Sequence, residues 1–509
     1  MVSKDSKKRA LVSVSDKSGV ADFAKGLLQL GYEIISTGGT YEHIKQTGVI
    51  KIEDVTGFAE MLNGRVKTLH PKIHGGILAK RDENAHMDAL AEHGISTIDL
   101  VVINLYPFAK VLQTPGSCHE EIIENIDIGG PALIRSAAKN HKHVLVVVDA
   151  CDYDMVLNEL ATGGVDLKIK ERLAAKAFRH TAAYDGVIAE YMSSEVFPEK
   201  LNLVYELKQK LRYGENPHQN AALYQPVIPN MNSILAAKQL HGKELSYNNA
   251  ADADMALKLI REFDEPAAAV IKHQNPCGVG IGKSLAEAFK FAYEADPVSI
   301  YGGIIALNKQ VDDKTAELMK PIFLDIILAP SFSDGALKIL KKKKDLRLLE
   351  LENMGYNDKK TIIGIEGGLL VQETDSFGFE HANVKFPTIK KPGANQLETA
   401  RFAWKVVKHV KSNAILVAKE GKTLGIGAGQ TSRVGAAKIA IEAAGENAMG
   451  AVLASDAMVP MPDTVELAAK AGIAVIIQTG GSIKDDEVIE ACNKHGIAMI
   501  LTGIRHFKH

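Results

Sequence analysis

The chain has 509 residues, of which 46% are hydrophobic and 24% charged, and its formal net charge is −2. A single core rarely grows beyond roughly 250–300 residues, so this length predicts two to four domains. The near-neutral charge argues against a protein that coats nucleic acid or a membrane surface. We therefore expect small-molecule partners, no nucleic acid and no membrane, with any anionic ligand met by local clusters of Arg and Lys.

No export signal is recognisable in the sequence. The first apolar run stops at Asp16 after about five residues, short of the roughly 7–15 that a signal peptide needs. No stretch approaches the roughly 18 apolar residues of a membrane span. The four cysteines are scattered without CxxC spacing, which suits a reducing compartment. These features predict a cytoplasmic protein without a disulfide framework.

From the start of the chain, short apolar runs alternate with helical patterns. The strand-like runs are 10–15, 33–37, 99–108 and 143–149, and helical patterns occupy 20–31 and 38–48. Such alternation predicts a parallel sheet with helices on both faces. The fold class is therefore α/β.

Two stretches have the composition of domain boundaries. A Ser-Ser pair followed by Pro198 places the first near 195–205, which predicts domains 1–200 and 201–509. A polar stretch with Pro and Gly at 375–395 suggests that the second domain is itself divided into two subdomains there.

The turn Ser-Thr-Gly-Gly-Thr at 36–40 links a predicted strand to a predicted helix. Glycines allow a tight turn, and free N–H groups at the start of a helix attract an anion. Taken alone, such a turn is more often an ordinary connection than a phosphate site. Residues 64–76, "GRVKTLHPKIHGG", place five cationic or imidazole side chains within the ten residues from Arg65 to His74. Their Pro and Gly residues predict a loop on which the cations converge, and a solvated basic loop is the alternative.

Three further positions suit acid–base chemistry near that turn. Tyr106 follows a buried strand at its carboxyl end, where open parallel sheets bind ligands. Asp127 precedes Gly129-Gly130, and the helix that follows can direct N–H groups at a developing negative charge. Lys139 lies about two turns further along. Each is a weak signal, but together they indicate acid–base catalysis on a phosphorylated small molecule.

In "AVIKHQNPCGVGIG" (269–282), a strand-like run ends at Lys272-His273. Metal ligation, buried packing and work on a substrate all remain open for this stretch. Zinc deaminases carry HxE and PCxxC, but Cys277 has no second cysteine at that spacing, so we expect no metal and a packing role. The string "GIGAGQTSR" lacks the third glycine of GxGxxG, which argues against a dinucleotide.

Longer strings carry a resemblance to a known family. "SVSDKSG", "STGGT", "TGFAEMLNGRVKTLHPKIHGGIL", "NLYPF" and "ENIDIGGPALIRSAAKNH" resemble the cyclohydrolase half of the bifunctional purine-biosynthesis enzymes that join AICAR transformylase to IMP cyclohydrolase. "KLRYGENPHQ", "SYNNAADAD", "IKHQNPCG", "GGIIALN", "VKSNAI", "GIGAGQTSR" and "RHFKH" resemble the transformylase half. The likeness covers essentially the whole chain in order.

The resemblance implies a fold and two reactions. The fold would be a methylglyoxal-synthase-like parallel-sheet domain followed by cytidine-deaminase-like α/β subdomains. The first reaction would transfer a formyl group from 10-formyltetrahydrofolate to the 5-amino group of AICAR, and the second would close formyl-AICAR to IMP with loss of water. It also implies a homodimer, and no catalytic metal.

For ring closure, the resemblance implies that Lys67, Tyr106, Asp127 and Lys139 serve the chemistry, with Asp127 as the base. An ordinary Asp has a pKa near 3.9, so an effective base here needs a raised pKa or tight positioning. The residues implied to hold the substrate are Ser15, Lys17, Thr37, Gly39, Thr40, Arg65, Thr68, Asn104, Ile128 and Gly129.

For formyl transfer, the resemblance implies that His273 takes a proton from the AICAR amine and that Lys272 stabilises the developing charge. Neighbouring residues of a regular strand point to opposite faces, so this pair needs an irregular backbone, for which Asn275-Pro276 gives a reason. The residues implied to contact AICAR are Arg212, Tyr213, His218, Gly302, Asp325, Asn413, Arg433, Arg505 and Phe507.

The folate is implied to lie near Gln430, Ser432, Met458, Pro460, Met461 and Asp463. One departure from the family falls here: the usual aromatic-rich "SDAFFPF" is "SDAMVPMPD" in this chain, so Met458, Val459 and Met461 replace phenylalanines. Met still forms an apolar wall. The alternative interpretation is a folate- or nucleotide-binding homologue that keeps cyclohydrolase activity but has impaired transformylase activity.

Overall fold

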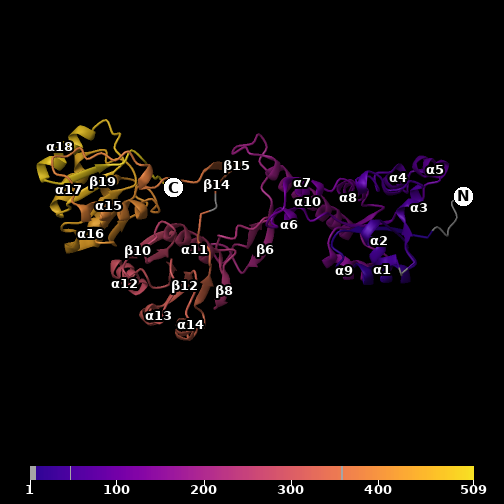
Figure 1. Ribbon diagram of the computed structural model, residues 1–509, viewed down its shortest axis with the longest axis horizontal. Helices are drawn as coiled ribbons and strands as arrows, with labels where there is room; N and C mark the ends of the chain where they lie inside the picture. The colour runs from indigo at the N-terminus through magenta and orange to yellow at the C-terminus, as the bar shows by residue number, and fades with distance from the viewer. Residues whose placement is uncertain (1–6, 46–47, 357–358) are drawn as a thin grey trace. The chain divides into compact units, whose positions relative to one another are not determined.

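The computed structural model describes residues 7–45, 48–356 and 359–509 (Figure 1). The chain forms two compact units. Unit 1 is Met1–Glu206 with Pro226–Ile228, and unit 2 is Leu207–Gln225 with Pro229–His509. Both units combine helices with sheets, so the predicted α/β class is confirmed.

Unit 1 contains a five-stranded parallel sheet in the order β3-β2-β1-β4-β5, as the alternating pattern predicts. The strands are β1 (Arg9–Val14), β2 (Glu33–Ser36), β3 (Ile50–Lys51), β4 (Leu100–Asn104) and β5 (Leu145–Val147). Separate apolar clusters fill the two faces of this sheet. Because both faces are covered, the central strands are almost continuously apolar.

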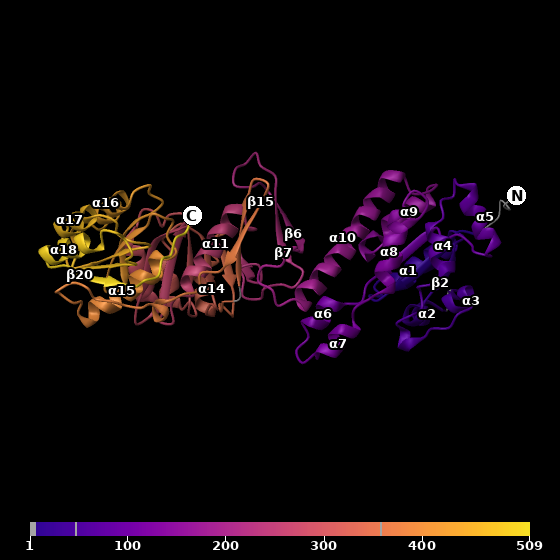
Figure 2. The ribbon, with the colours of Figure 1, turned by 90° about the horizontal axis from the view of Figure 1, so that it is seen from above.

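Helices cover both faces of this sheet (Figure 2). One face packs on α1 (Val20–Gln29) and α9 (Tyr153–Ala161), and the other on α4 (Pro71–Leu78), α8 (Gly129–Lys139) and the long α10 (Leu167–Met192). The shorter helices are α2 (Gly38–Ile44), α3 (Ile52–Thr56), α5 (Asn84–Glu92), α6 (Phe108–Leu112) and α7 (His119–Glu124).

Unit 2 is built on an eleven-stranded sheet in the order β20-β19-β18-β16-β17-β10-β9-β11-β12-β13-β8. Its first half consists of β8 (Lys238–His241), β9 (Ala267–Lys272), β10 (Asn275–Ile281), β11 (Gly303–Leu307), β12 (Leu324–Ala329) and β13 (Arg347–Glu350). Its second half consists of β16 (Ile415–Lys419), β17 (Lys422–Gly427), β18 (Val452–Ser455), β19 (Val475–Gln478) and β20 (Ala498–Leu501).

The two halves of this sheet mirror each other in strand order. Reading outward from the centre, one half runs β10-β9-β11-β12-β13 and the other β17-β16-β18-β19-β20. Each half begins with a helix and a hairpin and continues as alternating helices and parallel strands. Unit 2 is therefore an internally doubled α/β structure.

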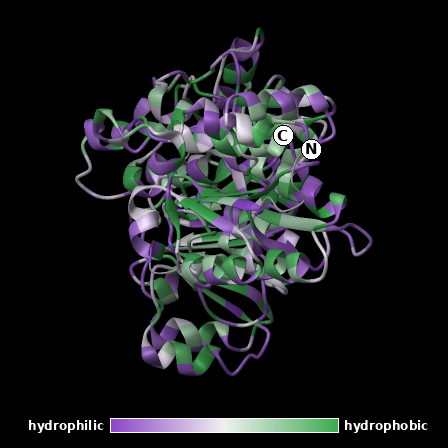
Figure 3. Cartoon of the chain, turned by 90° about the vertical axis from the view of Figure 1, so that its right-hand side faces the viewer, coloured by the Kyte–Doolittle hydropathy of each residue, from purple (hydrophilic) through white to green (hydrophobic). Residues whose placement is uncertain are grey.

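The helices follow the same doubling. The first half carries α11 (Tyr247–Ile260), α12 (Leu285–Ala295), α13 (Asp313–Met319) and α14 (Asp334–Leu340), and the second α15 (Ala394–Val407), α16 (Arg433–Ala444), α17 (Pro462–Lys470) and α18 (Asp485–His495). One apolar cluster spans both halves beneath α11 and α15, and each half has a further cluster on its other face. Most of the strands drawn in Figure 3 have the green colour of apolar residues.

Alternate glycines mark the two central strands. A Cβ on Gly278 or Gly280 would collide with backbone carbonyls of α12, and a Cβ on Gly425 or Gly427 with those of α16. The string "GIGAG" therefore lets a helix lie close against its strand, which accounts for the glycines without a dinucleotide.

Two smaller ribbons complete the fold. One pairs β6 (Tyr205–Leu211) with β7 (Ala221–Pro226), and the other pairs β14 (Lys360–Ile365) with β15 (Gly368–Glu373). Among the described residues, none of the helices combines the length and apolar character needed to cross a bilayer.

Candidate active sites

Unit 1 contains a cavity of about 560 Å³ at the carboxyl ends of β1, β2 and β4 and the start of α8. This edge is where open parallel sheets bind ligands. The structure brings thirteen of the predicted residues to the wall of this cavity: Ser15, Lys17, Thr37, Gly39, Thr40, Arg65, Lys67, Thr68, Asn104, Tyr106, Asp127, Ile128 and Gly129.

Two of these residues fix the loop after β1. The Thr40 hydroxyl accepts the Val14 N–H at 3.0 Å and donates to the Val14 carbonyl at 2.8 Å. The Asn104 amide oxygen accepts the N–H groups of Ser15 (2.5 Å) and Asp16 (2.9 Å). Because these polar groups already have partners, Thr40 and Asn104 shape the site more than they offer free groups to a ligand.

Two cations of the cavity lie near carboxylates, whereas Lys17 donates to the Val14 and Ser15 carbonyls, both at 3.3 Å. Lys67 Nζ lies 4.0 Å from Glu60 Oε2, and Arg65 pairs with Glu124 on the exposed rim. Exposed ion pairs contribute little stability, so an anionic ligand can replace Glu124 at Arg65 at little cost in free energy. Sequence reasoning did not identify Glu60, Asn63 or Glu124 as wall residues, because an isolated acidic or amide side chain gives no signal of its place in a cavity.

Asp127 is held between α8 and a tyrosine. Its Oδ1 accepts the Gly130 N–H at 2.8 Å, and its own N–H donates to the Tyr184 hydroxyl at 2.8 Å. Burial raises the pKa of Asp127, and this effect outweighs the N–H donors of Gly130 and Tyr106 and the charge of Lys67, which lower it. A Cβ on Gly130 would lie 2.5 Å from Oδ2, so this position has no room for a side chain.

One predicted catalytic residue of unit 1 lies outside the cavity. Lys139, the last residue of α8, is exposed and is not part of the cavity wall; it lies about 15 Å along the helix from Gly129. The structure does not bring it to the other residues, and its catalytic role stays a prediction.

The prediction of a loop throughout 64–76 is wrong, because α4 begins at Pro71. Proline is favourable in the first turn of a helix, and the His70 ring caps it by accepting the Lys72 N–H at 3.2 Å. Gly76 lies within this helix, and the position has no room for a side chain because a Cβ there would lie 2.6 Å from the Ser96 carbonyl oxygen.

In unit 2, Lys272 and His273 lie where β9 turns into β10. His273 and Gln274 form a two-residue turn and both have positive φ, 54° and 58°. The predicted irregularity is therefore the turn itself, followed by a register shift between Pro276 and Gly278. Lys272 Nζ donates to the Tyr301 carbonyl at 2.8 Å.

Cys277 packs beside an apolar cluster of unit 2. Burial raises the pKa of its thiol to about 12, so it is a poor thiolate. Within residues 7–45, 48–356 and 359–509, no group of three or more His, Cys, Asp or Glu side chains is arranged to hold a metal ion.

Arg433, which is predicted to contact the nucleotide, has protein partners in this structure. Its guanidinium is buried and pairs with the buried Asp456, and it also donates to the Ala414 carbonyl at 3.0 Å. The Ser412 hydroxyl donates to the other oxygen of Asp456. This arginine thus stabilises the segment around Asn413, whose side-chain amide donates to the Gln430 carbonyl at 2.9 Å.

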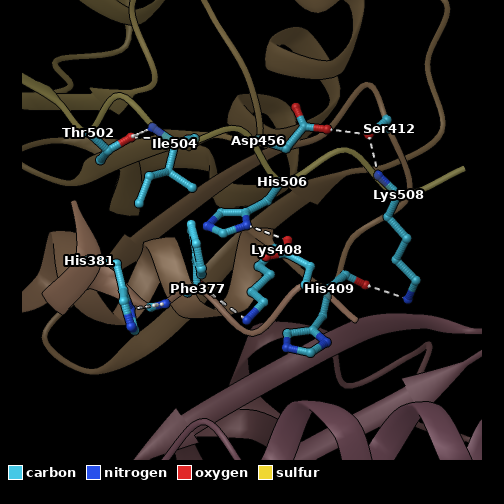
Figure 4. A network of polar contacts seen from close by, with 12 residues as sticks. Phe377, His381, Lys408, His409, Ser412, Asp456, Thr502, Ile504, His506 and Lys508 are labelled. Atoms are coloured by element: carbon cyan, nitrogen blue, oxygen red, sulfur yellow. Dashed lines mark hydrogen bonds and ion pairs between the residues drawn. The ribbon is translucent and has the colours of Figure 1, made fainter. Parts of the chain in front are cut away.

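The C-terminal residues 505–508 alternate between exposed and anchored side chains, and Figure 4 shows the anchored His506 and Lys508. His506 is buried, with Nδ1 2.6 Å from Asp375 Oδ2, and Lys508 donates through Nζ to the His409 carbonyl at 3.1 Å. Arg505 and Phe507 stay exposed, with the guanidinium 4.6 Å from the ring centre. An extended segment with period two therefore presents the two predicted nucleotide contacts on one side.

A buried carboxylate lies next to this segment. Glu262 accepts from the Tyr356 hydroxyl at 3.0 Å and His409 Nε2 at 2.9 Å, and Lys408 Nζ lies 3.1 Å away. Burial alone would raise the pKa of Glu262, but these donors and charges outweigh it and lower the pKa to about 2. Lys408 also donates to the Phe377 carbonyl at 3.3 Å (Figure 4).

Arg212, the predicted phosphate contact, lies over the Tyr213 ring, with its guanidinium carbon 5.1 Å from the ring centre. A second arginine lies nearby. Arg347 is buried in β13, where burial lowers its pKa and the nearby charge of Asp325 opposes that change. Sequence reasoning missed Arg347, although an arginine inside an apolar strand is itself a signal. Of the other predicted AICAR contacts, Gly302 has a positive φ of 72° and His218 is exposed.

The predicted folate wall is only partly exposed. Met458 and Met461 each expose 43% of their surface, whereas Val459 is fully buried and its N–H donates to Gln478 Oε1 at 2.9 Å. Asp463 lies in the first turn of α17, and Ser432 caps α16. Of the three substituted positions, two therefore face outward.

Comparison with known proteins identifies the family. The model of the AICARFT/IMPCHase bienzyme matches residues 137–443, and that of the MGS-like domain matches 19–132. Relatives called bifunctional purine biosynthesis protein PurH are 59% identical in Halalkalibacterium halodurans, 60% in Listeria welshimeri and 56% in Bacillus subtilis. Each alignment covers 99% of this chain and at least 99% of the relative. The chain therefore belongs to the AICARFT/IMPCHase bienzyme family and carries out AICAR formyl transfer and IMP ring closure, the last two steps of IMP synthesis.

Proposed function

We propose that the cavity of unit 1 closes the ring of formyl-AICAR, and that the Lys272-His273 turn of unit 2 transfers the formyl group from 10-formyltetrahydrofolate. The observation that carries the first assignment is the convergence of thirteen predicted residues, from segments far apart in sequence, on one cavity.

Ring closure needs a nucleophile, a base and a site for negative charge. The carboxamide nitrogen attacks the formyl carbon and gives up a proton to Asp127, while the former formyl oxygen is protonated to a hydroxyl. The C–O bond then breaks as this hydroxyl takes a second proton and leaves as water, and the formyl-bearing nitrogen loses its proton to form the ring C=N bond. The raised pKa of Asp127 suits this task, since a base works best near the operating pH. Backbone N–H groups at Ile128 and Gly129, at the start of α8, face the developing oxyanion.

The other cavity residues hold and orient the substrate. Lys17 and Arg65 bind the phosphate with Ser15, Thr37 and Gly39, while Lys67 and Tyr106 exchange protons at the reacting groups. Both reacting groups belong to one molecule, so fixing the productive rotamer supplies much of the rate.

Formyl transfer needs help for a weak nucleophile. The AICAR amine is delocalised into its ring, so His273 takes its proton during attack and Lys272 stabilises the oxyanion or the departing N10. Around them we place Arg212 and Arg505 on the phosphate and Phe507 on the ring. The remaining contacts to AICAR are Tyr213, His218, Gly302, Asp325 and Asn413.

The formyl donor binds beside this nucleotide. Gln430 and Ser432 lie near the transferring group, and Met458, Pro460, Met461 and Asp463 line the folate. The exposure of both methionines supports a flexible apolar wall in place of aromatic stacking.

We further propose a homodimer in the cytoplasm that acts on small molecules, without nucleic acid or membrane. The β14–β15 ribbon supports the dimer, because it exposes Ile363, Ile365, Leu369 and Leu370 by 45–56%. A contiguous apolar ribbon of this kind is typical of an interface. The four free cysteines suit a reducing compartment.

Two assays on purified protein test the assignments. His273→Ala should lower kcat of formyl transfer while sparing cyclisation of supplied formyl-AICAR, and Lys67→Ala should do the reverse. Release of tetrahydrofolate, followed in the wild type with AICAR and 10-formyltetrahydrofolate, separates the enzyme from a homologue with impaired transformylase. Full turnover by His273→Ala would show that the base is assigned wrongly.

A further inference from the structure

The backbone that carries the His273 imidazole is held in an unfavourable conformation. With φ of 54° and 58°, His273 and Gln274 form the central pair of a turn in which both residues are left-handed. Such two-residue hairpins favour Asn-Gly, Asp-Gly or Gly-Gly, because other side chains clash with their own backbone there. Strain of this kind persists only where surrounding contacts enforce it, and it is concentrated at functional sites.

The second half of unit 2 contains the matching hairpin with more usual residues. There β16 and β17 are joined by Glu420 and Gly421, with φ of 50° and 75°. Glycine adopts this conformation without steric cost. Gln274 thus stands where the matching turn has glycine, and the catalytic turn needs another source of support.

Asp252 supplies that support from α11. Its Oδ1 accepts the Gln274 N–H at 2.7 Å, and its Oδ2 accepts the His273 N–H at 3.2 Å. One carboxylate therefore binds both amides of the turn with charge-assisted hydrogen bonds, the stronger kind. At the matching sixth position of α15, the Thr399 hydroxyl instead donates within its own helix, to the Asn395 carbonyl at 2.9 Å.

The other side of the turn is tied down as well. The Asn275 side-chain amide donates to the His273 carbonyl at 3.2 Å, and its oxygen accepts the Lys411 N–H at 3.1 Å. The turn is thereby connected to the segment that carries Asn413. Asp252 and Asn275 together hold both the N–H and the carbonyl of His273.

We propose that Asp252 is a positioning residue for formyl transfer: it fixes the left-handed turn so that the imidazole meets the AICAR amine. This inference rests on the proposed role of His273 as base. Without the carboxylate, the turn relaxes toward conformations with negative φ, which redirects the imidazole.

The test compares Asp252→Asn with Asp254→Asn. Asp254 lies on the same helix but is bound through an exposed ion pair to Lys258, at 2.7 Å, so it is the matched control. In Asp252→Asn, an NH₂ group replaces one of the two acceptors. We expect kcat of formyl transfer to fall about 100-fold, as for a misplacement of about 1 Å, with KM for AICAR within about threefold. Cyclisation of formyl-AICAR and the rate of Asp254→Asn should be unchanged.

A second substitution separates positioning from general stability. Gln274→Gly gives the turn the glycine of the matching hairpin, so Asp252→Asn/Gln274→Gly should recover at least about tenfold in kcat over Asp252→Asn. Gln274→Gly alone should stay within about threefold of wild type. Because glycine removes the strain of the turn, the double variant should fold even if Asp252→Asn alone folds poorly, and its kcat can then still be measured.

Unchanged kcat in Asp252→Asn, or no recovery in the double variant, would overturn the positioning role. His273→Ala in parallel distinguishes the two failures. If His273→Ala is fully active, the proposed base is wrong; if it is inactive while Asp252→Asn is active, only the inference about Asp252 fails.

Discussion

Gly130→Ala tests whether the position of Asp127 limits ring closure. The added Cβ would lie 2.5 Å from Asp127 Oδ2 and 2.7 Å from a methyl carbon of Leu105. Ordinary contact begins at 3.4 Å, so the carboxylate has to move by about 0.9 Å. A misplacement of about 1 Å costs on the order of 100-fold in rate, or about 2.7 kcal/mol of transition-state stabilisation.

The assay is the cyclisation of supplied formyl-AICAR, with formyl transfer measured on the same sample. Formyl transfer should be unaffected, because the residues proposed for it lie in unit 2. Unfolding of unit 1 should cost about 1–3 kcal/mol less in the variant, since the substitution overpacks the site.

Gly75→Ala is the matched control, because the nearest atoms to its Cβ, on Ile95 and Leu90, lie at 3.5 and 3.6 Å. It should keep full activity and gain up to about 1 kcal/mol of helix stability. If Gly130→Ala cyclises within threefold of wild type, the position of Asp127 does not govern the reaction.

Three other substitutions test separate parts of the structure. Asp127→Asn removes a half-buried acid whose pKa is raised, so its ionised form destabilises the fold. At pH 7 the variant should therefore have a higher calorimetric unfolding temperature of unit 1, and its cyclisation should be at least about 100-fold slower. A lower unfolding temperature would contradict this. Glu262, with its pKa lowered from 4.5 to about 2, contributes stability above pH 4.5 that is lost as the pH falls toward 2. The free energy of unfolding of Glu262→Gln should therefore be lower than that of wild type by up to about 3 kcal/mol at pH 7. The difference should shrink as the pH falls from 4.5 toward 2, measured by the fluorescence of the single tryptophan, Trp404. An equal difference at every pH would refute the linkage. Met458→Phe with Met461→Phe should lower KM for 10-formyltetrahydrofolate up to about tenfold if ring stacking is restored, and no change removes that explanation.

Much of unit 1 could be predicted because its signals are local. Tyr106 and Asp127 follow apolar strands or precede Gly-Gly, and the rule that parallel sheets bind ligands at their carboxyl edge brings such residues together. The error at 64–76 came from treating Pro71 as a helix breaker, although proline in the first turn starts a helix.

Unit 2 was harder to predict because its key relations join distant residues. Arg433 pairs with the buried Asp456, and nothing in the sequence near either residue indicates this pairing. The internal doubling is similarly hidden, because strand order belongs to the sheet and not to any segment. Only the glycines shared by "GVGIG" and "GIGAG" hint at it.

The central pair of strands in unit 2 also helps the chain to avoid aggregation. Strands β10 and β17 are paired antiparallel, and the Thr423 hydroxyl joins them by accepting the Val279 N–H at 2.9 Å. A fragment containing only one half would expose the N–H and carbonyl groups that this contact joins, including the Ile281 N–H that donates to the Gly421 carbonyl at 2.8 Å. Such bare edges recruit other chains. Each half of the sheet therefore acts as the other's protection against aggregation.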